Sequence, residues 1–207
     1  MKPNFNEEKK LWKQGFNFVV GLDESGRGPL AGPVLAAAVC IRKNFVIKNL
    51  KINDSKKLSQ KQRAYFYKKL TNHKNIKWGI GIVSEKVIDR INILQATRLA
   101  MKMAVKNLGI QPEFLILDGN FTLNNVNISQ KSIVKGDEKV FSCSAAGIIA
   151  KVTRDKIMEN LHKKYPNYGF DRHKGYGTKL HIKNINDFGP CKIHRKSFYP
   201  VSSIYKS

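Results

Sequence analysis

The spacing of apolar residues divides the chain into short strand-like segments and longer helix-like ones. A short unbroken apolar run is typical of a strand buried on both faces, and alternation of apolar with small or polar residues is typical of a half-buried strand. The isoleucines and the tryptophan at alternate positions of 76–82 are therefore expected to form the buried face of their strand. Five segments are predicted to be strands: residues 16–23, 33–41, 76–82, 114–118 and 128–134.

Apolar residues three and four positions apart predict helices in the remaining segments. Ser59 and Gln62 have the spacing of a capping box, in which each side chain bonds to the backbone of the other residue. A helix is therefore expected to begin after Ser59. Further helices are predicted after Ser84, over 92–108, over 178–188 and, as a short helix or arm, within the polar residues 1–15.

The longest predicted helix begins at Asp137 and is expected to continue unbroken to Leu161. Its small residues at 144–147 would let it pack closely against a sheet, at a cost of about 1 kcal/mol for the glycine relative to alanine. Residues 165–177, which precede the last helix, combine aromatic, basic and glycine residues and are expected to form a loop.

Alternating strands and helices predict an α/β fold in which helices flank a sheet. The first two strands are close enough in sequence to be antiparallel neighbours, and parallel strands are expected among the others. Residues 1–165 are predicted to form the principal domain, with 1–15 as an N-terminal arm. Residues 166–207 are predicted to be a helical extension that contributes to binding and does not fold independently.

The charge of the chain is strongly unbalanced. Lysine and arginine total 38 against 15 acidic residues, a formal net charge of +23. Such an excess predicts a polyanionic partner, and nucleic acid is the first candidate because phosphates bind Lys and Arg regardless of base sequence. Aromatic residues interleaved with cations at 165–177 and 194–198 favour the same partner. A lysine-rich bias of the source proteome is the alternative explanation.

The composition is that of a globular protein without a membrane segment. No run approaches the roughly 18 to 20 apolar residues of a bilayer span, and no apolar segment follows Met1 as a signal peptide would require. The cysteines, Cys40, Cys143 and Cys191, are odd in number and lack CxxC spacing, which argues against a disulfide framework. We therefore expect reduced thiols in a cytoplasmic protein, and we expect a monomer.

Six acidic residues fall on predicted helices or polar arms and are each expected to be solvated or to pair with a helix dipole. These are Glu7, Glu8, Glu85, Asp89, Glu159 and Asp187. Four others have a different setting: Asp23 and Glu24 end one predicted strand, Asp118 ends another, and Asp137 stands at the start of a helix. Carboxylates at adjacent strand ends would meet at one edge of the sheet, and their repulsion would require a cation.

Oxygen-only ligands select hard cations, which here means Mg²⁺ or Mn²⁺. Two such ions about 3.5 to 4 Å apart can activate a water and stabilise the leaving oxygen during phosphodiester hydrolysis. The four acids are therefore candidates for a two-metal nuclease site. The alternative is that Asp118 only starts a turn and Asp137 only caps a helix.

Arg27 stands between Gly26 and Gly28, so it is either a basic turn residue or a substrate contact. Glycine permits the close backbone approach that a substrate contact requires. His173 and His194 lack the spacing of a metal or acid-base pair and are expected to be structural or close to phosphates. Basic residues that could contact phosphates, unless they are simply solvated, are Lys56, Lys57, Lys151 and Arg154.

Seven short segments of the chain match the motifs of a known protein family, in the same order. They are GLDESGRGPLAGP at 21–33, NDSKKL at 53–58, LDGN at 117–120, KGD at 135–137, AKVTRD at 150–155, HKGYGT at 173–178 and HRKSF at 194–198. Together they resemble the type 2 ribonucleases H, specifically the bacterial ribonuclease HII family, over roughly residues 19 to 200.

This resemblance implies a ribonuclease H-like fold, with a five-stranded mixed sheet flanked by helices and a C-terminal helical extension. It implies metal-dependent endonucleolytic cleavage of RNA in RNA/DNA hybrids and 5′ to ribonucleotides embedded in duplex DNA. The expected products have 3′-hydroxyl and 5′-phosphate ends, and the expected roles are ribonucleotide removal and RNA primer removal. A non-catalytic basic nucleic-acid-binding protein is the alternative, in which the acids are turn and capping residues.

The resemblance also implies roles for particular residues. The metal-binding acids of the family fall on Asp23, Glu24, Asp118 and Asp137. The glycine-arginine-glycine element of the family, which contacts the 2′-hydroxyl and nearby phosphates, falls on Gly26, Arg27 and Gly28. The junction-sensing tyrosine falls on Tyr176, and its ring is expected to pack on the deoxyribose that follows the ribonucleotide.

Overall fold

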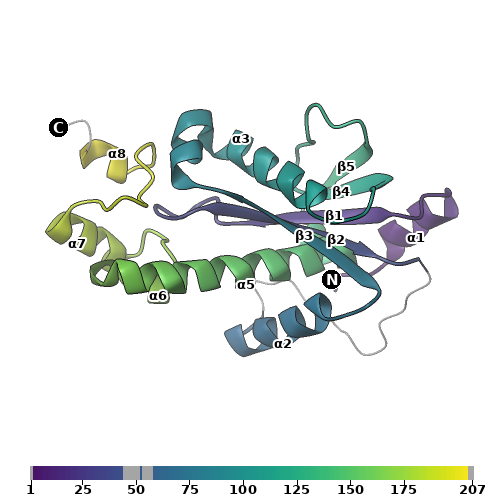
Figure 1. Cartoon of the computed structure of the whole chain (residues 1–207), viewed down its shortest axis with the longest axis horizontal. Helices are drawn as coiled ribbons and strands as arrows, with labels where there is room; N and C mark the ends of the chain where they lie inside the picture. Colours follow the sequence, from purple (N-terminus) through teal and green to yellow (C-terminus); the bar gives the residue numbers. More distant parts are fainter. Residues whose placement is uncertain (1, 44–51, 53–57, 205–207) are drawn as a thin grey trace.

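A computed structural model describes residues 2–43, 52 and 58–204 of the chain. Its centre is a five-stranded sheet with the strand order β3-β2-β1-β4-β5 (Figure 1). β2 is antiparallel to both β1 and β3, whereas β4 is parallel to β1 and to β5. The predicted mixed sheet is therefore confirmed. The strands are β1 Val19–Ser25, β2 Val34–Ile41, β3 Ile76–Val83, β4 Phe114–Asp118 and β5 Ser129–Ile133.

Two long helices cover the two faces of the sheet (Figure 1). α3 (Glu85–Lys106) packs on β2 and β3, and α5 (Phe141–Lys164) packs on β1 and β2 from the other side. The remaining helices are α1 Asn6–Lys13, α2 Gln60–Thr71, α4 Gly136–Lys139, the 3-10 helix η1 Pro166–Tyr168, α6 Phe170–His173, α7 Lys179–Phe188 and α8 Val201–Ile204.

The buried face of β3 is in part the opposite of the predicted one. A Cβ added to Gly79 would overlap the carbonyl oxygen of Ala104 in α3, and one added to Gly81 would overlap that of Ala100. The glycines therefore let α3 lie directly on the strand. Ile82, on the face predicted to be buried, is 44% exposed.

The apolar spacing predicted the helix break at Asn92 correctly but missed the one at Val140. The separate helices after Ser84 and after Asn92 are confirmed, because Asn92 has φ 64° and ψ 166° and interrupts α3. The Asn92 Oδ1 accepts hydrogen bonds from the next turn, as a capping residue does. The continuous helix predicted from Asp137 is wrong, because Val140 is extended (φ −109°, ψ 125°) and pairs in a parallel bridge with Asn4.

Other local predictions have mixed outcomes. The capping box of Ser59 and Gln62 is confirmed by hydrogen bonds in both directions. The segment 165–177, predicted to be a loop, contains the short helices η1 and α6.

The N-terminal arm is docked on the domain by a buried acid. Glu8 is 1% exposed, and its Oε1 accepts a hydrogen bond of 2.8 Å from the Ser142 amide in the first turn of α5. Phe5 stacks on Phe141 with ring centroids 4.3 Å apart. Of the two settings predicted for Glu8, the solvated one is therefore wrong. Glu8 caps the N-terminus of α5, where Val140 has no side-chain acceptor.

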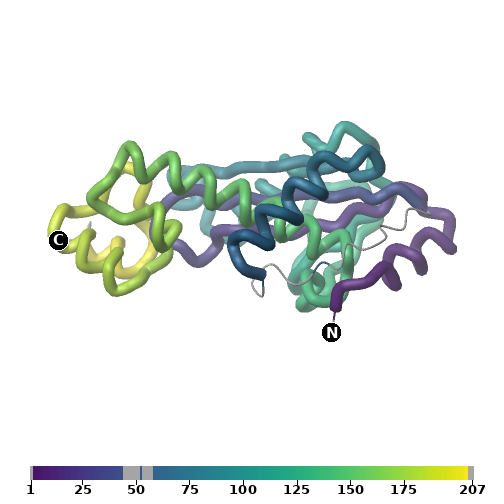
Figure 2. The backbone as a smooth tube through the Cα atoms, turned by 90° about the horizontal axis from the view of Figure 1, so that it is seen from below, coloured from purple at the N-terminus to yellow at the C-terminus, as the bar shows by residue number. Residues whose placement is uncertain are grey.

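The C-terminal helices gather at one end of the molecule, and α1 lies toward the other (Figure 2). They form a separate apolar cluster that also includes the loop after β1, through Leu30 and Ala31, and the α5 residue Met158. The amide of Arg195 donates to the Leu30 carbonyl at 2.8 Å, and the amide of Gly32 donates to the Ile193 carbonyl at 2.9 Å. The loop that follows β1 is thus held between the sheet and the C-terminal segment.

Candidate active site

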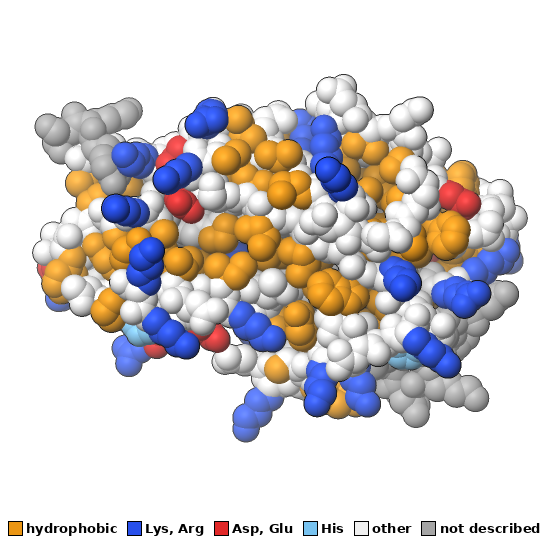
Figure 3. Space-filling view, in the orientation of Figure 1, with side chains coloured by type: hydrophobic (Ala, Val, Ile, Leu, Met, Phe, Trp, Pro, Cys, Tyr) orange, Lys and Arg blue, Asp and Glu red, His pale blue; other side chains and the backbone are white. Residues whose placement is uncertain are grey.

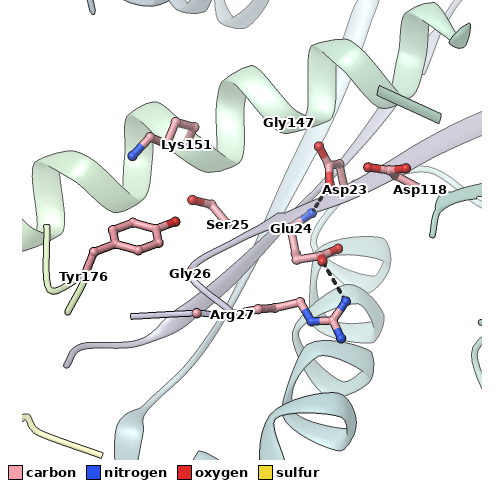
Figure 4. Close-up of a pocket in the computed structure, with 10 residues that line it drawn as sticks. Asp23, Glu24, Ser25, Gly26, Arg27, Asp118, Gly147, Lys151 and Tyr176 are labelled. Atoms are coloured by element: carbon pink, nitrogen blue, oxygen red, sulfur yellow. Dashed lines mark hydrogen bonds and ion pairs between the residues drawn. The ribbon is translucent and has the colours of Figure 1, made fainter. Parts of the chain in front are cut away.

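The register of two parallel strands places two of the predicted acids side by side. Leu22 of β1 is paired with Leu117 of β4, so the next residues, Asp23 in β1 and Asp118 at the end of β4, lie at adjacent positions. Val20 and Leu22 pack toward α3, and alternation along the strand therefore directs Asp23 toward α5. Figure 4 shows the carboxylates of Asp23 and Asp118 directed toward each other.

The third acid reaches this point through a tight turn after β5. Lys135 has a left-handed backbone conformation (φ 57°), and the Gly136 amide then donates a hydrogen bond of 2.7 Å to Asp118 Oδ1. Asp137 follows in the short α4 and is 4% exposed. One carboxylate oxygen from each of Asp23, Asp118 and Asp137 lies within 4.8 Å of the others.

A glycine in α5 makes room for Asp23. An added Cβ at Gly147 would overlap Asp23 Oδ2, and one at Gly21 would overlap Ser142 in the same helix. The predicted close approach of the small residues 144–147 to the sheet is therefore confirmed. The Asp23 carboxylate is pressed against the helix, with Oδ1 accepting a hydrogen bond of 2.7 Å from the Glu24 amide.

The electrostatics of the three acids favour a cation. Burial raises the pKa of Asp23 well above its ordinary value, and repulsion from the neighbouring carboxylates raises it further. A positive ion among the three carboxylates would stabilise the charged form of Asp23 and so lower its pKa again. The donor set consists of oxygen atoms alone, which suits a hard divalent cation.

Glu24 lies outside the group of three. It follows Asp23 on β1 and therefore projects from the opposite side of the strand. Its Oε1 is 3.3 Å from the Arg27 guanidinium, and Figure 4 shows Arg27 turned toward it. Glu24 nevertheless lines the same pocket as Asp23 and Asp118.

A pocket of about 230 Å³ joins the acids to most of the predicted substrate contacts (Figure 4). Gly26, Arg27 and Gly28 line it, as do Lys151 from α5 and Tyr176 from the segment before α7. The Lys151 ammonium lies 2.7 Å from Asp155 and 5.9 Å from the centre of the Tyr176 ring. Five residues predicted to contact substrate are thus brought to the same pocket.

The sequence reasoning missed the residue that fixes the Gly26–Gly28 loop. Arg195 is fully buried, and its guanidinium donates hydrogen bonds to the carbonyls of Gly26 (2.6 Å), Arg27 (3.0 Å) and Gly32 (2.9 and 3.0 Å). Burial lowers the pKa of Arg195 to about 9, which leaves it charged at neutral pH. The segment at 194–198 had been singled out, but as a nucleic-acid surface.

Arg154 also holds backbone carbonyls inside the fold, so the prediction that it contacts a phosphate must be corrected. It is fully buried, and its guanidinium donates to the carbonyls of Ala31, Pro33 and Lys174 at 2.9 to 3.1 Å. These bonds occupy the guanidinium inside the fold, so a phosphate contact is not available to it in this structure. Lys56 and Lys57 lie outside the described residues.

Several other predictions concern residues away from the acids. His173 and His194 are buried, 9% and 2% exposed, which fits the structural role expected of them. Asp89, expected to be solvated, accepts hydrogen bonds from the amides of Lys196 and Ser197 at 2.9 and 3.0 Å. The thiols of Cys40, Cys143 and Cys191 are free. Within the part of the chain that the structure describes, none of the helices is long and apolar enough to cross a membrane.

The sheet order and the two covering helices, with Asp23 and Asp118 side by side on β1 and β4, define a ribonuclease H-like α/β fold. The crystal structure of the ribonuclease H2 from Pyrococcus horikoshii OT3 matches 91% of this chain and 97% of its own with a TM-score of 0.76 at 26% identity. Bst-RNase HIII in complex with Mn²⁺ matches 92% of this chain and 70% of its own with a TM-score of 0.69 at 16% identity, which shows the fold alone.

Sequence comparison narrows this class to one family. The family model for ribonuclease HII matches residues 20–201. The ribonuclease HII of Acetivibrio thermocellus is 54% identical over 191 residues, which cover 92% of this chain and 73% of that protein. The ribonuclease HII of Bacillus cytotoxicus is 51% identical over 200 residues, which cover 97% and 75% respectively. The chain therefore belongs to the ribonuclease HII family, and the predicted resemblance is confirmed.

Proposed function

We propose that this chain hydrolyses phosphodiester bonds on the 5′ side of ribonucleotides, in RNA/DNA hybrids and in duplex DNA, through divalent cations held by Asp23, Asp118 and Asp137. The observation that carries this proposal is the closeness of the three carboxylates, within 4.8 Å, two of which, Asp23 and Asp118, line the pocket that Arg27 and Tyr176 also line. Membership of the ribonuclease HII family supports the same reaction and substrates.

Mg²⁺ or Mn²⁺ fits the three acids, because their donor atoms are oxygens and because burial, together with repulsion from neighbouring carboxylates, raises the pKa of Asp23 where no cation is bound. When bound, divalent cations supply the Lewis acidity that polarises the scissile phosphate and lowers the pKa of an attacking water. The Mn²⁺ complex of a protein with this fold, Bst-RNase HIII, supports the choice. We assign Glu24 to the same site, where its carboxylate would turn from Arg27 to the ions when substrate arrives.

The residues around the acids would select the sugar that is cut. Gly26 has φ 98° and lacks a side chain, so the backbone of the Gly26–Gly28 loop can approach a 2′-hydroxyl closely. Arg27 is exposed and would contact a neighbouring phosphate once released from Glu24. The Tyr176 ring, 41% exposed at the pocket, would pack on the deoxyribose that follows the ribonucleotide, and Lys151 beside it would contact a phosphate.

We extend the proposal to the products and the organisation of the chain. Cleavage would leave 3′-hydroxyl and 5′-phosphate ends and would serve ribonucleotide and primer removal in the cytoplasm. The protein would act as a monomer. Residues 166–207 would depend on residues 1–165 for folding, because their apolar cluster is completed by Leu30, Ala31 and Met158.

Cleavage of a DNA duplex that carries one ribonucleotide tests this function directly. We expect a single nick 5′ to the ribonucleotide with Mg²⁺ or Mn²⁺, lost in Asp23→Asn and retained in Asp187→Asn. Asp187 is the matched control because its ion pair with Lys183 is exposed on α7. Binding without cleavage in either ion would instead support the non-catalytic alternative, and cleavage that survives Asp23→Asn would refute the assigned site.

The charge excess is tested separately. Lys and Arg side chains are spread over the face shown in Figure 3, with few acids among them. If they bind the duplex, log K should fall linearly with log salt, with a slope of about 0.9 per phosphate contacted. A flat response would assign the excess to the composition of the proteome.

A further inference from the structure

Three imidazoles are buried directly behind the segment that carries Tyr176. His173, His181 and His194 are 9%, 0% and 2% exposed. The rings of His173 and His181 stack with centroids 4.3 Å apart, and those of His181 and His194 are 5.2 Å apart. None of the three lines the pocket of the acids.

The hydrogen bonds of two of these rings fix where their protons lie. His194 Nδ1 lies 2.9 Å from the Cys191 backbone amide, which can only donate, and farther, at 3.3 Å, from the Cys191 carbonyl, so the shorter contact makes this nitrogen an acceptor without a proton. A neutral His194 therefore carries its proton on Nε2, which is 3.0 Å from His181 Nε2. His181 Nε2 must then accept, and its proton lies on Nδ1, which donates to the Tyr176 carbonyl at 2.9 Å.

The result is a directional hydrogen-bond chain, in which the Cys191 amide donates to His194, His194 donates to His181, and His181 donates to the backbone carbonyl of Tyr176. Burial lowers the pKa of His181 and of His194 to about 4 in each case, which agrees with two neutral rings at neutral pH. A proton added to His181 would place two N–H groups at the 3.0 Å contact between the Nε2 atoms, and one added to His194 would place an Nδ1–H group against the Cys191 amide.

The end of this hydrogen-bond chain matters because the Tyr176 side chain is exposed. It is 41% exposed, and the Lys151 ammonium lies 5.9 Å from the centre of its ring. Its backbone is better held. The amide donates to the His173 carbonyl at 2.9 Å, and the carbonyl accepts from the Thr178 amide at 2.8 Å as well as from His181.

We propose that His181, oriented by His194, is a positioning residue that fixes the backbone of Tyr176 and thereby the direction in which its ring enters the substrate pocket. The inference rests on the proposed function, in which this ring packs on the sugar beside the ribonucleotide. His173 supports the same turn from the other side: its Nδ1 accepts from the Gly175 amide at 3.2 Å, and its Nε2 donates to the Tyr168 carbonyl at 2.7 Å.

Two substitutions at His181 separate positioning from packing. His181→Asn places an amide N–H near the position of Nδ1 and can still donate to the Tyr176 carbonyl, whereas His181→Leu fills space and donates nothing. On duplex DNA with one ribonucleotide in Mg²⁺, we expect kcat/KM to fall about tenfold or more in His181→Leu. His181→Asn should recover most of this loss.

A double-mutant cycle gives the decisive result. If His181 acts through Tyr176, the loss caused by His181→Leu should largely vanish in a Tyr176→Ala background. An equal loss in both backgrounds, or a full loss in His181→Asn, would overturn the inference. Wild-type protein that does not cut at all would instead refute the proposed function, so the two failures are distinguishable.

A second measurement needs no variant. The ¹⁵N chemical shifts of the imidazoles in the wild-type protein report which nitrogen of each ring carries the proton. We expect Nε2–H in His194 and Nδ1–H in His181. The opposite tautomer in either ring would be incompatible with the hydrogen-bond chain and would overturn the inference, even if His181→Leu fails to fold.

Discussion

The carboxylate of Asp23 lies against Gly147 of α5, where an added side chain would overlap its Oδ2 atom. Burial also raises the pKa of Asp23, so the helix both buries the group and limits where it can move. The geometry of the proposed metal site therefore depends on a residue that contributes no ligand.

We expect Gly147→Ala to reduce cleavage strongly while the protein stays folded. The new methyl group would push the Asp23 carboxylate away from Asp118, and a displacement of about 1 Å in a catalytic group can cost on the order of 100-fold in rate. The kcat measured at saturating Mg²⁺ tests this, with circular dichroism to verify the fold. Asn160→Ala, at an exposed position of the same helix, is the control. A Gly147→Ala protein with wild-type kcat would show that Asp23 need not hold this position.

Neutralising one acid should stabilise the protein without metal and remove the effect of metal. In EDTA, Asp23→Asn relieves repulsion among buried carboxylates, so its melting temperature should equal or exceed that of the wild type. Mn²⁺ at about 100 times its Kd should stabilise the wild type by roughly 2.7 kcal/mol and the variant by much less. Differential scanning calorimetry with and without Mn²⁺ measures both. Equal metal stabilisation of the two proteins would place the ions elsewhere.

Replacing Arg195 should loosen the Gly26–Gly28 loop. Lysine keeps the charge but cannot reach the three carbonyls that the guanidinium bridges, so Arg195→Lys is expected to lose about 3 kcal/mol of unfolding free energy. The preference for a ribonucleotide over a deoxyribonucleotide should fall with it, because the loop would no longer be held at the sugar. Urea unfolding and cleavage of matched duplexes measure the two effects. Lys192→Met, an exposed site in the same segment, should change neither.

The sequence predicted the sheet and the meeting of Asp23 with Asp118 because both follow from local patterns. Apolar runs end at each acid, and the carboxyl ends of parallel strands share one edge of a sheet. A helix start was also correctly expected near Asp137. The extended conformation of Val140 was not, because it depends on pairing with Asn4 rather than on neighbouring residues.

The charged residues that were misplaced share a physical cause. Glu8 bonds to an amide 134 residues away, and Arg195 bonds to a carbonyl 169 residues away. A charge on a helix or in a tail is usually solvated, and nothing in its local sequence reveals a distant backbone partner. Arg154 was misplaced for the same reason, since its acceptors at 31 and 33 become neighbours only when the loop after β1 folds onto α5.

The buried histidines predict how stability changes with pH. The pKa of His181 and of His194 is lowered to about 4 in the folded protein, whereas an unfolded histidine titrates near 6.5. Between these values the unfolded chain binds protons that the folded protein does not. The stabilising contribution is therefore complete above about pH 6.5 and is lost as pH falls toward 4, at up to about 1.4 kcal/mol per pH unit for each histidine.

The raised pKa of Asp23 and of Glu8 acts in the opposite direction, since these acids take up protons more readily in the folded state. The informative quantity is therefore the difference between wild type and His181→Asn in the slope of unfolding free energy against pH, measured by urea unfolding in EDTA between pH 4.5 and 6.5. Removing one histidine should make the slope less positive, by up to the contribution of one proton. Identical slopes would mean that His181 binds protons equally in the folded and unfolded states. That result would contradict the inference that neutral His181 and His194 form the hydrogen-bond chain that ends at Tyr176.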